Sequence, residues 1–142
     1  MKKIYLFSDG SSLGNPGPGG YGTIIRYKDS EKILRGGEAH TTNNRMELLG
    51  VIEGLNALKE PCDVLVTSDS SYVVKGINEW LQNWIKKEFK KVKNPDLWKR
   101  YIEVSKPHKI EALWVKGHAG HEENERCDII ARTEAEQFKE RL

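Results

Sequence analysis

The chain has 142 residues, 37% of them hydrophobic and 31% charged, with a formal net charge of +2. This length fits a single domain, residues 1–142, and the composition is that of a globular protein rather than a disordered or fibrous one. No apolar run reaches the ~20 residues of a membrane helix, and the N-terminal run is too short for a secretory signal, so we expect a cytoplasmic protein.

The first predicted strand is Ile4–Asp9, where side chains alternate between two faces and the strand ends on a carboxylate. Residues 10–22, GSSLGNPGPGGYG, are turn-forming, and we expect them to lie outside strand interiors. Part of this stretch, Gly17–Gly22, matches the dinucleotide-binding pattern G-x-G-x-x-G. A strand-like segment follows it instead of a helix, so a loop leading into a hairpin is the better interpretation.

Hydrophobic periodicity and turn residues predict the remaining elements. In chain order they are strands near Tyr21–Tyr27 and Lys32–Ala39, a helix from Asn43 or Asn44 to about Lys59, a strand over Val64–Asp69, a helix from Ser70 or Ser71 through Trp80, a short helix after Pro95, a strand over Ile110–Val115, a loop over Lys116–Glu123, and a helix from about Asn124 to Lys139 that buries Cys127, Ile130, Ala131 and Phe138. The first three strands form a meander, so the sheet is mixed.

Four acidic residues stand at the ends of these elements: Asp9, Glu47, Asp69 and Asp128. Each has a structural explanation, because Glu47 could complete a capping box with Asn44, Asp69 could cap the next helix, and Asp128 suits the dipole of the last one. Parallel strands would, however, bring Asp9 and Asp69 together where α/β sheets bind ligands. Four converging carboxylates would repel one another without cations, and oxygen-only ligands favour magnesium or manganese.

Two histidines, His118 and His121, are spaced H-x-x-H with Cys127 six residues further on, which is one possible zinc pattern. It lacks the second ligand pair that such sites usually have. A histidine in the glycine-flanked loop, His118, is better placed to move protons near the acids. The other cysteine, Cys62, is far from Cys127 in sequence, and we interpret both as reduced thiols.

Positive charge is concentrated in one segment. Residues 86–100 contain seven basic and two acidic residues, a net charge of +5, so the rest of the chain carries −3. A solvated helix face is the usual explanation of a lysine run. Here Trp80, Trp84 and Phe89 are interleaved with the lysines, and aromatic side chains beside cations favour a nucleic-acid groove.

The sequence resembles the type 1 ribonucleases H of bacterial kind over nearly its whole length. The resemblance rests on SDGSSLGNPGPGGYG, TTNNRMEL, TSDSSYV, NPDLW and WVKGHAGHEENERCD, in order and at family-like spacing. It implies an α/β, ribonuclease H-like fold, with a five-stranded mixed sheet of three antiparallel and two parallel strands flanked by helices on both faces. It also implies endonucleolytic hydrolysis of the RNA strand of an RNA–DNA hybrid by a monomer with two Mg²⁺ ions, for which Mn²⁺ can substitute, giving 5′-phosphate and 3′-hydroxyl ends.

The resemblance also assigns roles to residues. The metal-binding carboxylates would be Asp9, Glu47, Asp69 and Asp128, and His118 would assist proton transfer and product release. Contacts to the hybrid map to a polar group and a basic protrusion, namely Asn15, Thr42, Asn43, Asn44 and Ser71, and then Trp80, Trp84, Lys86, Lys87, Lys90 and Lys91. The family often has a longer amide side chain where Ser71 stands, and the protrusion looks several residues shorter than in its best-known members.

Two other classes of function stay open at this point. Integrases, transposases and junction resolvases resemble this fold and use similar acids, so a DNA nuclease is one alternative. Glu47 in the first long helix and the GHAGH loop argue against it. A hybrid-binding module that has lost catalysis is the other, and the presence of all four acids argues against that.

Overall fold

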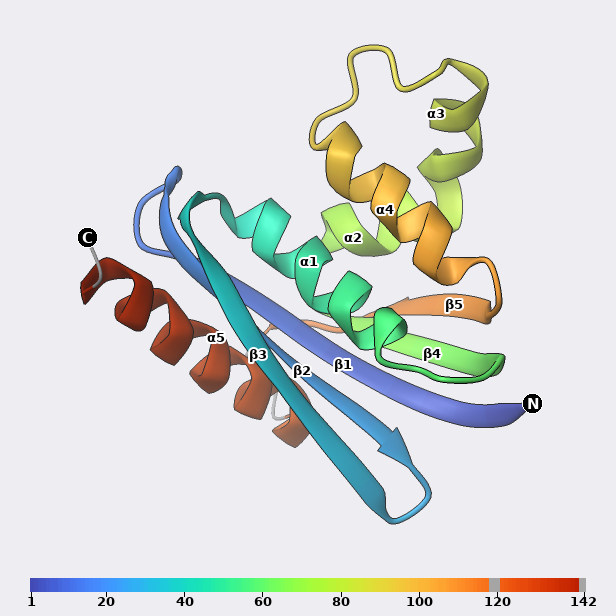
Figure 1. Cartoon of the computed structure of the whole chain (residues 1–142), viewed down its shortest axis with the longest axis horizontal. Coiled ribbons are helices and arrows are strands. Elements are labelled where there is room, and N and C mark those ends of the chain that lie inside the picture. Colours follow the sequence, from blue (N-terminus) through green and yellow to red (C-terminus); the bar gives the residue numbers. More distant parts are fainter. Residues whose placement is uncertain (118–120, 141–142) are drawn as a thin grey trace.

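A five-stranded mixed sheet forms the centre of the computed structural model, which describes residues 1–117 and 121–140 (Figure 1). The strand order is β3-β2-β1-β4-β5. Antiparallel pairing joins β1 to β2 and β2 to β3, whereas β4 runs parallel to β1 and to β5. The strands span Lys2–Ser12, Gly17–Tyr27, Ser30–Thr41, Cys62–Ser68 and Lys109–Trp114. This confirms the predicted fold class.

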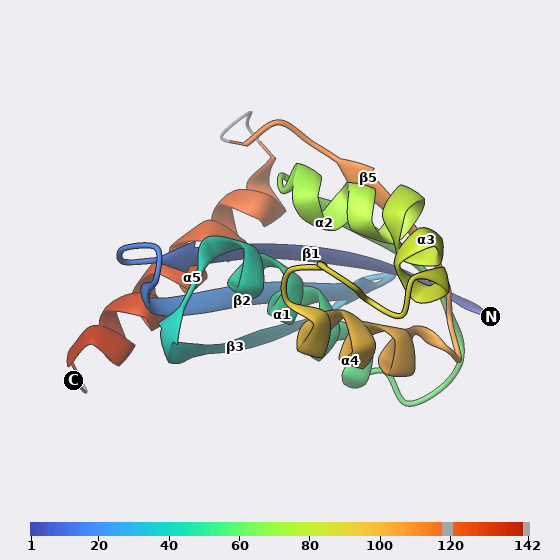
Figure 2. The same ribbon diagram turned by 90° about the horizontal axis from the view of Figure 1, so that it is seen from above.

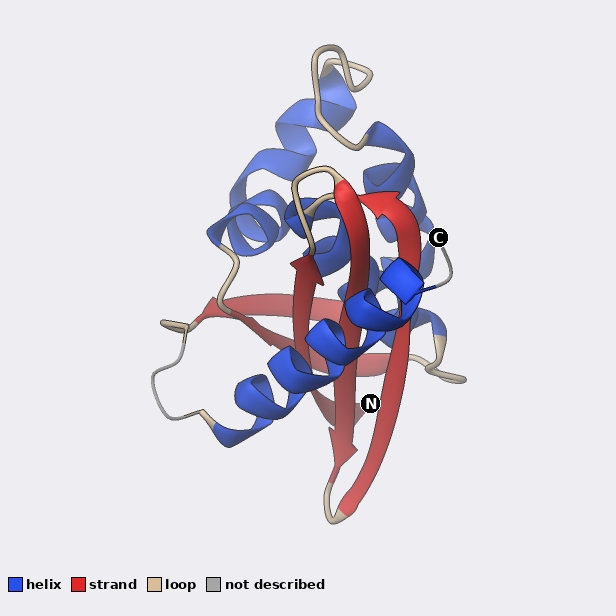
Figure 3. Cartoon of the chain, turned by 90° about the vertical axis from the view of Figure 1, so that its left-hand side faces the viewer, coloured by secondary structure: helices blue, strands red, loops and turns tan. Residues whose placement is uncertain are grey.

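Helices cover both faces of the sheet. They are α1 (Asn43–Asn56), α2 (Ser71–Lys75), α3 (Leu81–Lys86), α4 (Pro95–Ser105) and α5 (Glu122–Glu140). Neighbouring glycines of β2 identify the two faces, because Gly19 lies against Met46 of α1 and Gly20 against Ala131 of α5. Figure 3 shows α5 running across the strands, and Figure 1 shows α2, α3 and α4 gathered away from it. In Figure 2, α3 and α4 lie on the opposite side of the view from the C-terminus. No helix among the described residues is long and apolar enough to cross a membrane.

The hydrophobic core lies mainly between the sheet and the α1 side. Leu6 of β1, Val64 of β4 and Ile52 of α1 have no exposed surface, and Trp98 of α4 is completely buried. The rings of Tyr72, Trp84 and Tyr101 have their centroids 5.1–5.8 Å from that of Trp98. Trp98 also donates a 2.8 Å hydrogen bond to the Tyr72 hydroxyl. This aromatic cluster attaches α2, α3 and α4 to the rest of the core.

The glycine-rich stretch differs from its prediction. Much of residues 10–22 is strand, since β1 continues to Ser12 and β2 begins at Gly17. The prediction of turns was wrong there because these glycines lie within strands and make room for a helix packed against the sheet. A Cβ on Gly20 would lie 2.5 Å from the Ala131 carbonyl oxygen, and one on Gly22 would lie 2.6 Å from that of Cys127. Glycine at these positions lets the backbone of α5 approach β2.

Helix boundaries also differ from the predictions. The helix expected to run through Trp80 is α2 followed by a π-helical turn, Gly76–Trp80, which leads into α3. The first long helix ends at Asn56, earlier than predicted, and α5 begins at Glu122, two residues before the predicted start. Of the side chains expected to be buried on α5, Cys127 and Ala131 are buried, and Ile130 and Phe138 are partly exposed.

Gly10 of β1 allows α1 to lie directly against this strand, because a Cβ on it would collide with the Glu47 nitrogen and the Met46 backbone. We predict that Gly10→Ala lowers the free energy of unfolding by about 1–3 kcal/mol, since backbone atoms cannot move aside as a flexible side chain can. Chemical denaturation would measure the loss. Ser11→Ala, on the next residue of the strand, is the control and should change stability by less than about 0.5 kcal/mol. Equal stability of the two variants would contradict the close approach.

Candidate metal centre

Three acidic side chains meet just beyond the point where the parallel pairing of β1 with β4 ends. β1 and β4 pair in parallel with Phe7 opposite Thr67, so Asp9 and Asp69 follow at the same edge of the sheet, as their parallel arrangement predicted. Glu47 reaches the same place from the start of α1. One carboxylate oxygen of each of the three lies within 4.8 Å of the other two.

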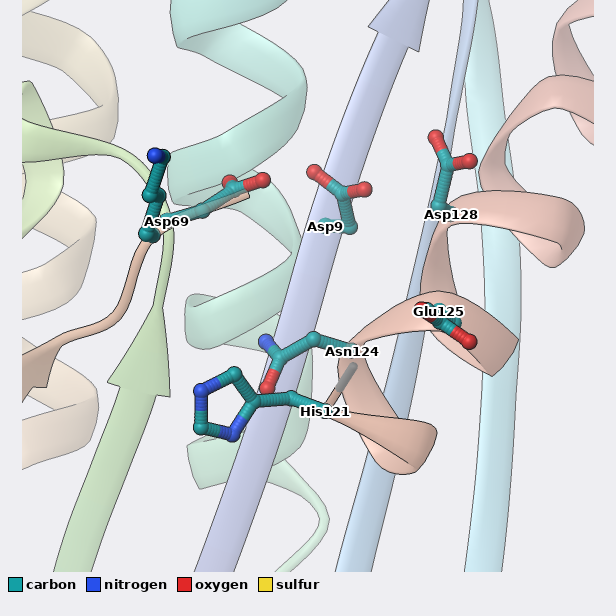
Figure 4. A pocket seen from close by; sticks show the side chains of 7 residues that line it. Asp9, Asp69, His121, Asn124, Glu125 and Asp128 are labelled. Carbon is teal, nitrogen blue, oxygen red and sulfur yellow. The ribbon is translucent and has the colours of Figure 1, made fainter. Parts of the chain in front are cut away.

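The fourth acid, Asp128, reaches this edge from α5. It lines a small pocket together with Asp9 and Asp69, and Figure 4 shows Asp9 between the other two in that view. One oxygen of Asp128 forms a 3.1 Å ion pair with Arg132, one helical turn further on. The structure therefore brings all four predicted carboxylates to one edge, three in a tight group and Asp128 beside them.

The structural explanations for two of these acids fail. Helix α1 is capped by Thr42, whose hydroxyl accepts a 3.2 Å hydrogen bond from the Arg45 nitrogen, so the capping box predicted around Asn44 is wrong. Helix α2 is capped by Ser70, not Asp69. Because a serine or threonine in the preceding position already caps each helix, neither Glu47 nor Asp69 is needed at a helix end.

Burial and mutual repulsion change how these acids ionise. Asp9 and Glu47 are 7% and 9% exposed. Burial, assisted by the charges of Asp69 and Asp128, raises the pKa of Asp9 to about 7, although the Gly10 nitrogen donates a 2.9 Å hydrogen bond that favours the ionised form. Burial and the charges of Asp9 and Asp69 raise the pKa of Glu47 well above its usual value. Both shifts show that the site has too much negative charge for its burial.

The residues fit a divalent metal ion. Glu47 Oε2 is buried and has no hydrogen-bond partner among the described residues. A buried carboxylate oxygen without a partner is costly, and a cation would both pair with it and neutralise the surplus charge. All the donors are carboxylate oxygens, which suit hard cations such as Mg²⁺ and Mn²⁺. Within residues 1–117 and 121–140, Asp9, Glu47 and Asp69 form the one group of histidine, cysteine and acidic residues close enough together to hold a metal ion.

The described residues do not support the alternative zinc site. Cys127 is fully buried, and its sulfur lies 3.5 Å from the Phe7 carbonyl oxygen, to which it donates. His121 instead lines the pocket of the carboxylates. The other histidine of the motif, His118, lies outside the described residues. Both cysteines are free thiols, as predicted.

The same pocket contains residues that the sequence analysis did not assign to the site. They are Lys116, His121, Asn124 and Glu125. His121 ends the GHAGH segment and the other three flank it, so treating residues 116–125 as one unit beside the strand ends would have found them. The sequence analysis considered His121 only as a zinc ligand and gave the other three no role.

The predicted polar group lies beside the acids. One hollow of the surface is lined by Asn15, Thr42, Asn43 and Asn44, with Lys93 and Asn94. A second is lined by Asn43, Asn44, Glu47, Asp69 and Ser71, with Gly10, Ser70 and Tyr72. Two asparagines are common to both, so the hollow surface continues from the acids to Asn15. Asn15 accepts a 3.1 Å hydrogen bond from the Asn43 nitrogen, which ties the β1–β2 loop to α1.

The basic protrusion, residues 80–93, is anchored by its tryptophans. The ring of Trp84 lies between those of Trp80 and buried Trp98, with centroid separations of 5.7 and 5.1 Å. Trp84 is therefore a packing residue at least in part, whereas Trp80 is 39% exposed. The predicted contact lysines are all exposed, two at the end of α3 and two in the turns that follow: Lys86, Lys87, Lys90 and Lys91.

Comparisons with known proteins agree with this geometry. The family model described as RNase H matches residues 1–136. The ribonuclease H of Sulfurovum sp. (strain NBC37-1) is 69% identical and covers 99% of this chain and 96% of that protein. LC9-RNase H1, a type 1 RNase H with the type 2 active-site motif, shares the fold with a TM-score of 0.87 and 30% identity, over 97% of this chain and 74% of that one. LC11-RNase H1 in complex with an RNA/DNA hybrid shares it with a TM-score of 0.67 and 21% identity, over 94% of this chain and 97% of that one.

A mixed sheet with carboxylates just beyond the parallel pairing of β1 with β4, and sequence matches over nearly the whole length, define one class of protein. The chain belongs to the RNase H family, whose members are metal-dependent nucleases. Within that family it is a ribonuclease H of the bacterial type 1 kind, as the sequence resemblance implied. The alternative of a binding module without catalysis is therefore set aside.

The raised pKa values predict how the stability of the metal-free protein depends on pH. Between about pH 4.5 and 7 the folded protein keeps a proton at Asp9 that the unfolded chain has released, because the pKa is about 7 in the fold. The folded state then binds more protons than the unfolded state, so stability falls as pH rises through this window. Asp9→Asn should raise metal-free stability at pH 7 by on the order of 1–4 kcal/mol and flatten the slope.

Denaturation in EDTA at several pH values would measure this dependence. Asp29→Asn, in the exposed β2–β3 turn, is the control and should keep the wild-type slope. A slope that Asp9→Asn leaves unchanged would contradict the raised pKa of Asp9.

Proposed function

We propose that this enzyme cleaves the RNA strand of RNA–DNA hybrids endonucleolytically, with divalent cations bound by Asp9, Glu47, Asp69 and Asp128. The observation that carries the proposal is the group of three carboxylates of Asp9, Glu47 and Asp69, the first two of them buried, whose excess charge requires cations. Membership of the RNase H family supports the hybrid as substrate, and LC11-RNase H1, which has the same fold, was found in complex with one.

The residues of the site divide the work as follows. When bound, two Mg²⁺ ions, or Mn²⁺ in their place, would supply the Lewis acidity that activates water and stabilises the leaving oxygen. The four carboxylates hold these cations, and the Gly10 nitrogen keeps the Asp9 carboxylate oriented through its 2.9 Å hydrogen bond. His118 is proposed to move protons and assist product release. The expected products carry 5′-phosphate and 3′-hydroxyl ends.

The polar hollow next to the acids is proposed to read the RNA strand. Its amides and hydroxyls, from Asn15, Thr42, Asn43, Asn44 and Ser71, can donate to and accept from sugar and base edges in a minor groove. The 2′-hydroxyl distinguishes RNA from DNA, and a wide, shallow minor groove displays it. The other strand would lie toward Trp80, Trp84 and the exposed lysines. Stacking of the aromatic rings on its sugars, together with phosphate contacts from the lysines, would favour a strand without 2′-hydroxyls.

The proposal also concerns the domain organisation, the oligomeric state and the cellular compartment of the protein. We infer one ribonuclease H domain over residues 1–142 that works as a monomer in the cytoplasm. The family match over residues 1–136 supports the single domain. The two free thiols are as expected of a protein in a reducing compartment.

Incubating labelled RNA–DNA hybrid, duplex RNA and duplex DNA with the enzyme tests the proposal. Hybrid should be cut far faster than duplex RNA, duplex DNA should be essentially untouched, and EDTA should stop cleavage. The amide variants Asp9→Asn, Glu47→Gln, Asp69→Asn and Asp128→Asn should lose most activity and remain folded. Glu136→Gln, on the exposed surface of α5, should stay active.

Two results would overturn the proposal. Cleavage of duplex DNA as fast as hybrid would favour the DNA-nuclease alternative. Wild-type turnover by several of the amide variants would refute the metal site.

The exposed lysines of the protrusion should determine how salt affects binding. Changing all four to glutamine, at Lys86, Lys87, Lys90 and Lys91, should raise KM and reduce the slope of log affinity against log salt by about 0.7–0.9 for each phosphate that is no longer neutralised. Turnover at saturating substrate should change little, because these residues lie apart from the carboxylates.

A variant with the same change in net charge is the matched control. It replaces four exposed lysines elsewhere, Lys32, Lys59, Lys106 and Lys139, and should keep a salt slope close to that of the wild type. Equal salt slopes in the two variants would show that the four lysines of the protrusion make no particular contact with the phosphates of the substrate.

A further inference from the structure

Asn124 is one of four side chains of the carboxylate pocket that have no role in the function proposed above. Asn124 stands in the first turn of α5 and lines the pocket together with Asp9, Asp69 and Asp128. Figure 4 shows its side chain projecting from the helix toward the strands that carry Asp9 and Asp69. Its neighbour on the outer side of the same turn, Glu122, is exposed and does not line this pocket.

The hydrogen bonds of Asn124 fix the orientation of its amide group. The Nδ2 atom donates to the main-chain oxygen of Thr67, at the end of β4, over 3.4 Å. That contact requires the nitrogen on the strand side, so the oxygen must occupy the other position. Oδ1 is buried and has no hydrogen-bond partner among the described residues. A buried acceptor without a donor is costly, so a further donor is expected there.

Water is the donor that fits the pocket. The cavity has a volume of about 10 Å³ and is lined by carboxylates, by the amide of Asn124 and by Lys116 and His121. A polar cavity of roughly 10–15 Å³ holds one water molecule when two to four polar groups surround it. Such a water can donate one hydrogen bond to Asn124 Oδ1 and a second to a carboxylate. An amide oxygen is a very weak base, so it would orient the water without taking its proton.

We propose that Asn124 is a further catalytic residue, whose amide oxygen accepts a hydrogen bond from the water that attacks the scissile phosphate. This inference rests on the proposed function. In the step, the water oxygen bonds to phosphorus and the bond from phosphorus to the 3′-oxygen breaks. The water gives one proton to a carboxylate of the site, which later releases it to solvent, and the 3′-oxygen takes a proton from solvent. Asn124 gains and loses none.

Two variants of similar shape separate this role from that of an anchor. Asn124→Leu removes both the donor to Thr67 and the acceptor, whereas Asn124→Asp removes the donor and keeps an acceptor in place. Asn124→Leu should lower kcat on the order of 10²-fold with little change in KM, because the water loses its orientation. Asn124→Asp should keep clearly more activity than Asn124→Leu, and the control Glu122→Gln should match the wild type.

Three further measurements exclude other roles. Calorimetry should give similar Mg²⁺ affinities for Asn124→Leu and the wild type, and thermal unfolding should show that both remain folded. A high-resolution crystal structure of the wild type should show a water bonded to Asn124 Oδ1 and to a carboxylate.

Several results would overturn the role of Asn124 alone: wild-type kcat in Asn124→Leu, equal losses of kcat and Tm in both variants, a loss of activity that follows a loss of Mg²⁺ affinity, or no water on Oδ1. Failure of the wild-type chain itself to cut hybrid would instead refute the proposed function and this role with it.

Discussion

The repulsion between buried Asp9 and Glu47 is the constraint on which the rest of the site depends. Asp9 and Glu47 are brought together because Gly10 lets α1 lie against β1 without an intervening side chain, and the parallel pairing of β1 with β4 adds Asp69. The fold tolerates the repulsion because β1 and α1, which carry these two acids, are held in place by an extensive apolar core. Such a local conflict between burial and charge is typical of functional sites.

The elements around the acids are tied together on two sides. The indole nitrogen of Trp114, at the end of β5, donates a 3.0 Å hydrogen bond to the main-chain oxygen of Asp69. On the other side, Arg26 of β2 binds Glu31 of β3 and Glu123 of α5, both over 2.7 Å. The ends of β4 and β5 and the start of α5 are thereby held in fixed relation to the sheet. The pocket between them depends on all three elements rather than on any one motif.

Charges of opposite sign are separated over the surface. The acids gather at the strand ends, where they would attract cations, and the lysines of residues 86–93 lie on a protrusion that packs through Trp84 onto the buried Trp98 ring. A polar hollow lies beside the acids, and Asn43 and Asn44 line it from end to end. A polyanion can therefore pair with the lysines while the acids remain available to cations.

Local sequence was enough to predict the strands, their mixed arrangement and the acids at their ends, because two-residue alternation and terminal polar residues are properties of neighbouring positions. It failed for residues 10–22, where Gly20 and Gly22 serve the approach of a helix more than 100 residues away. Tertiary structure alone decided the burial of Glu47 and the unpaired oxygen of Asn124, since both follow from helices packing on particular strands. Sequence determined which groups were available, and packing determined which of them lost water and so acquired unusual chemistry.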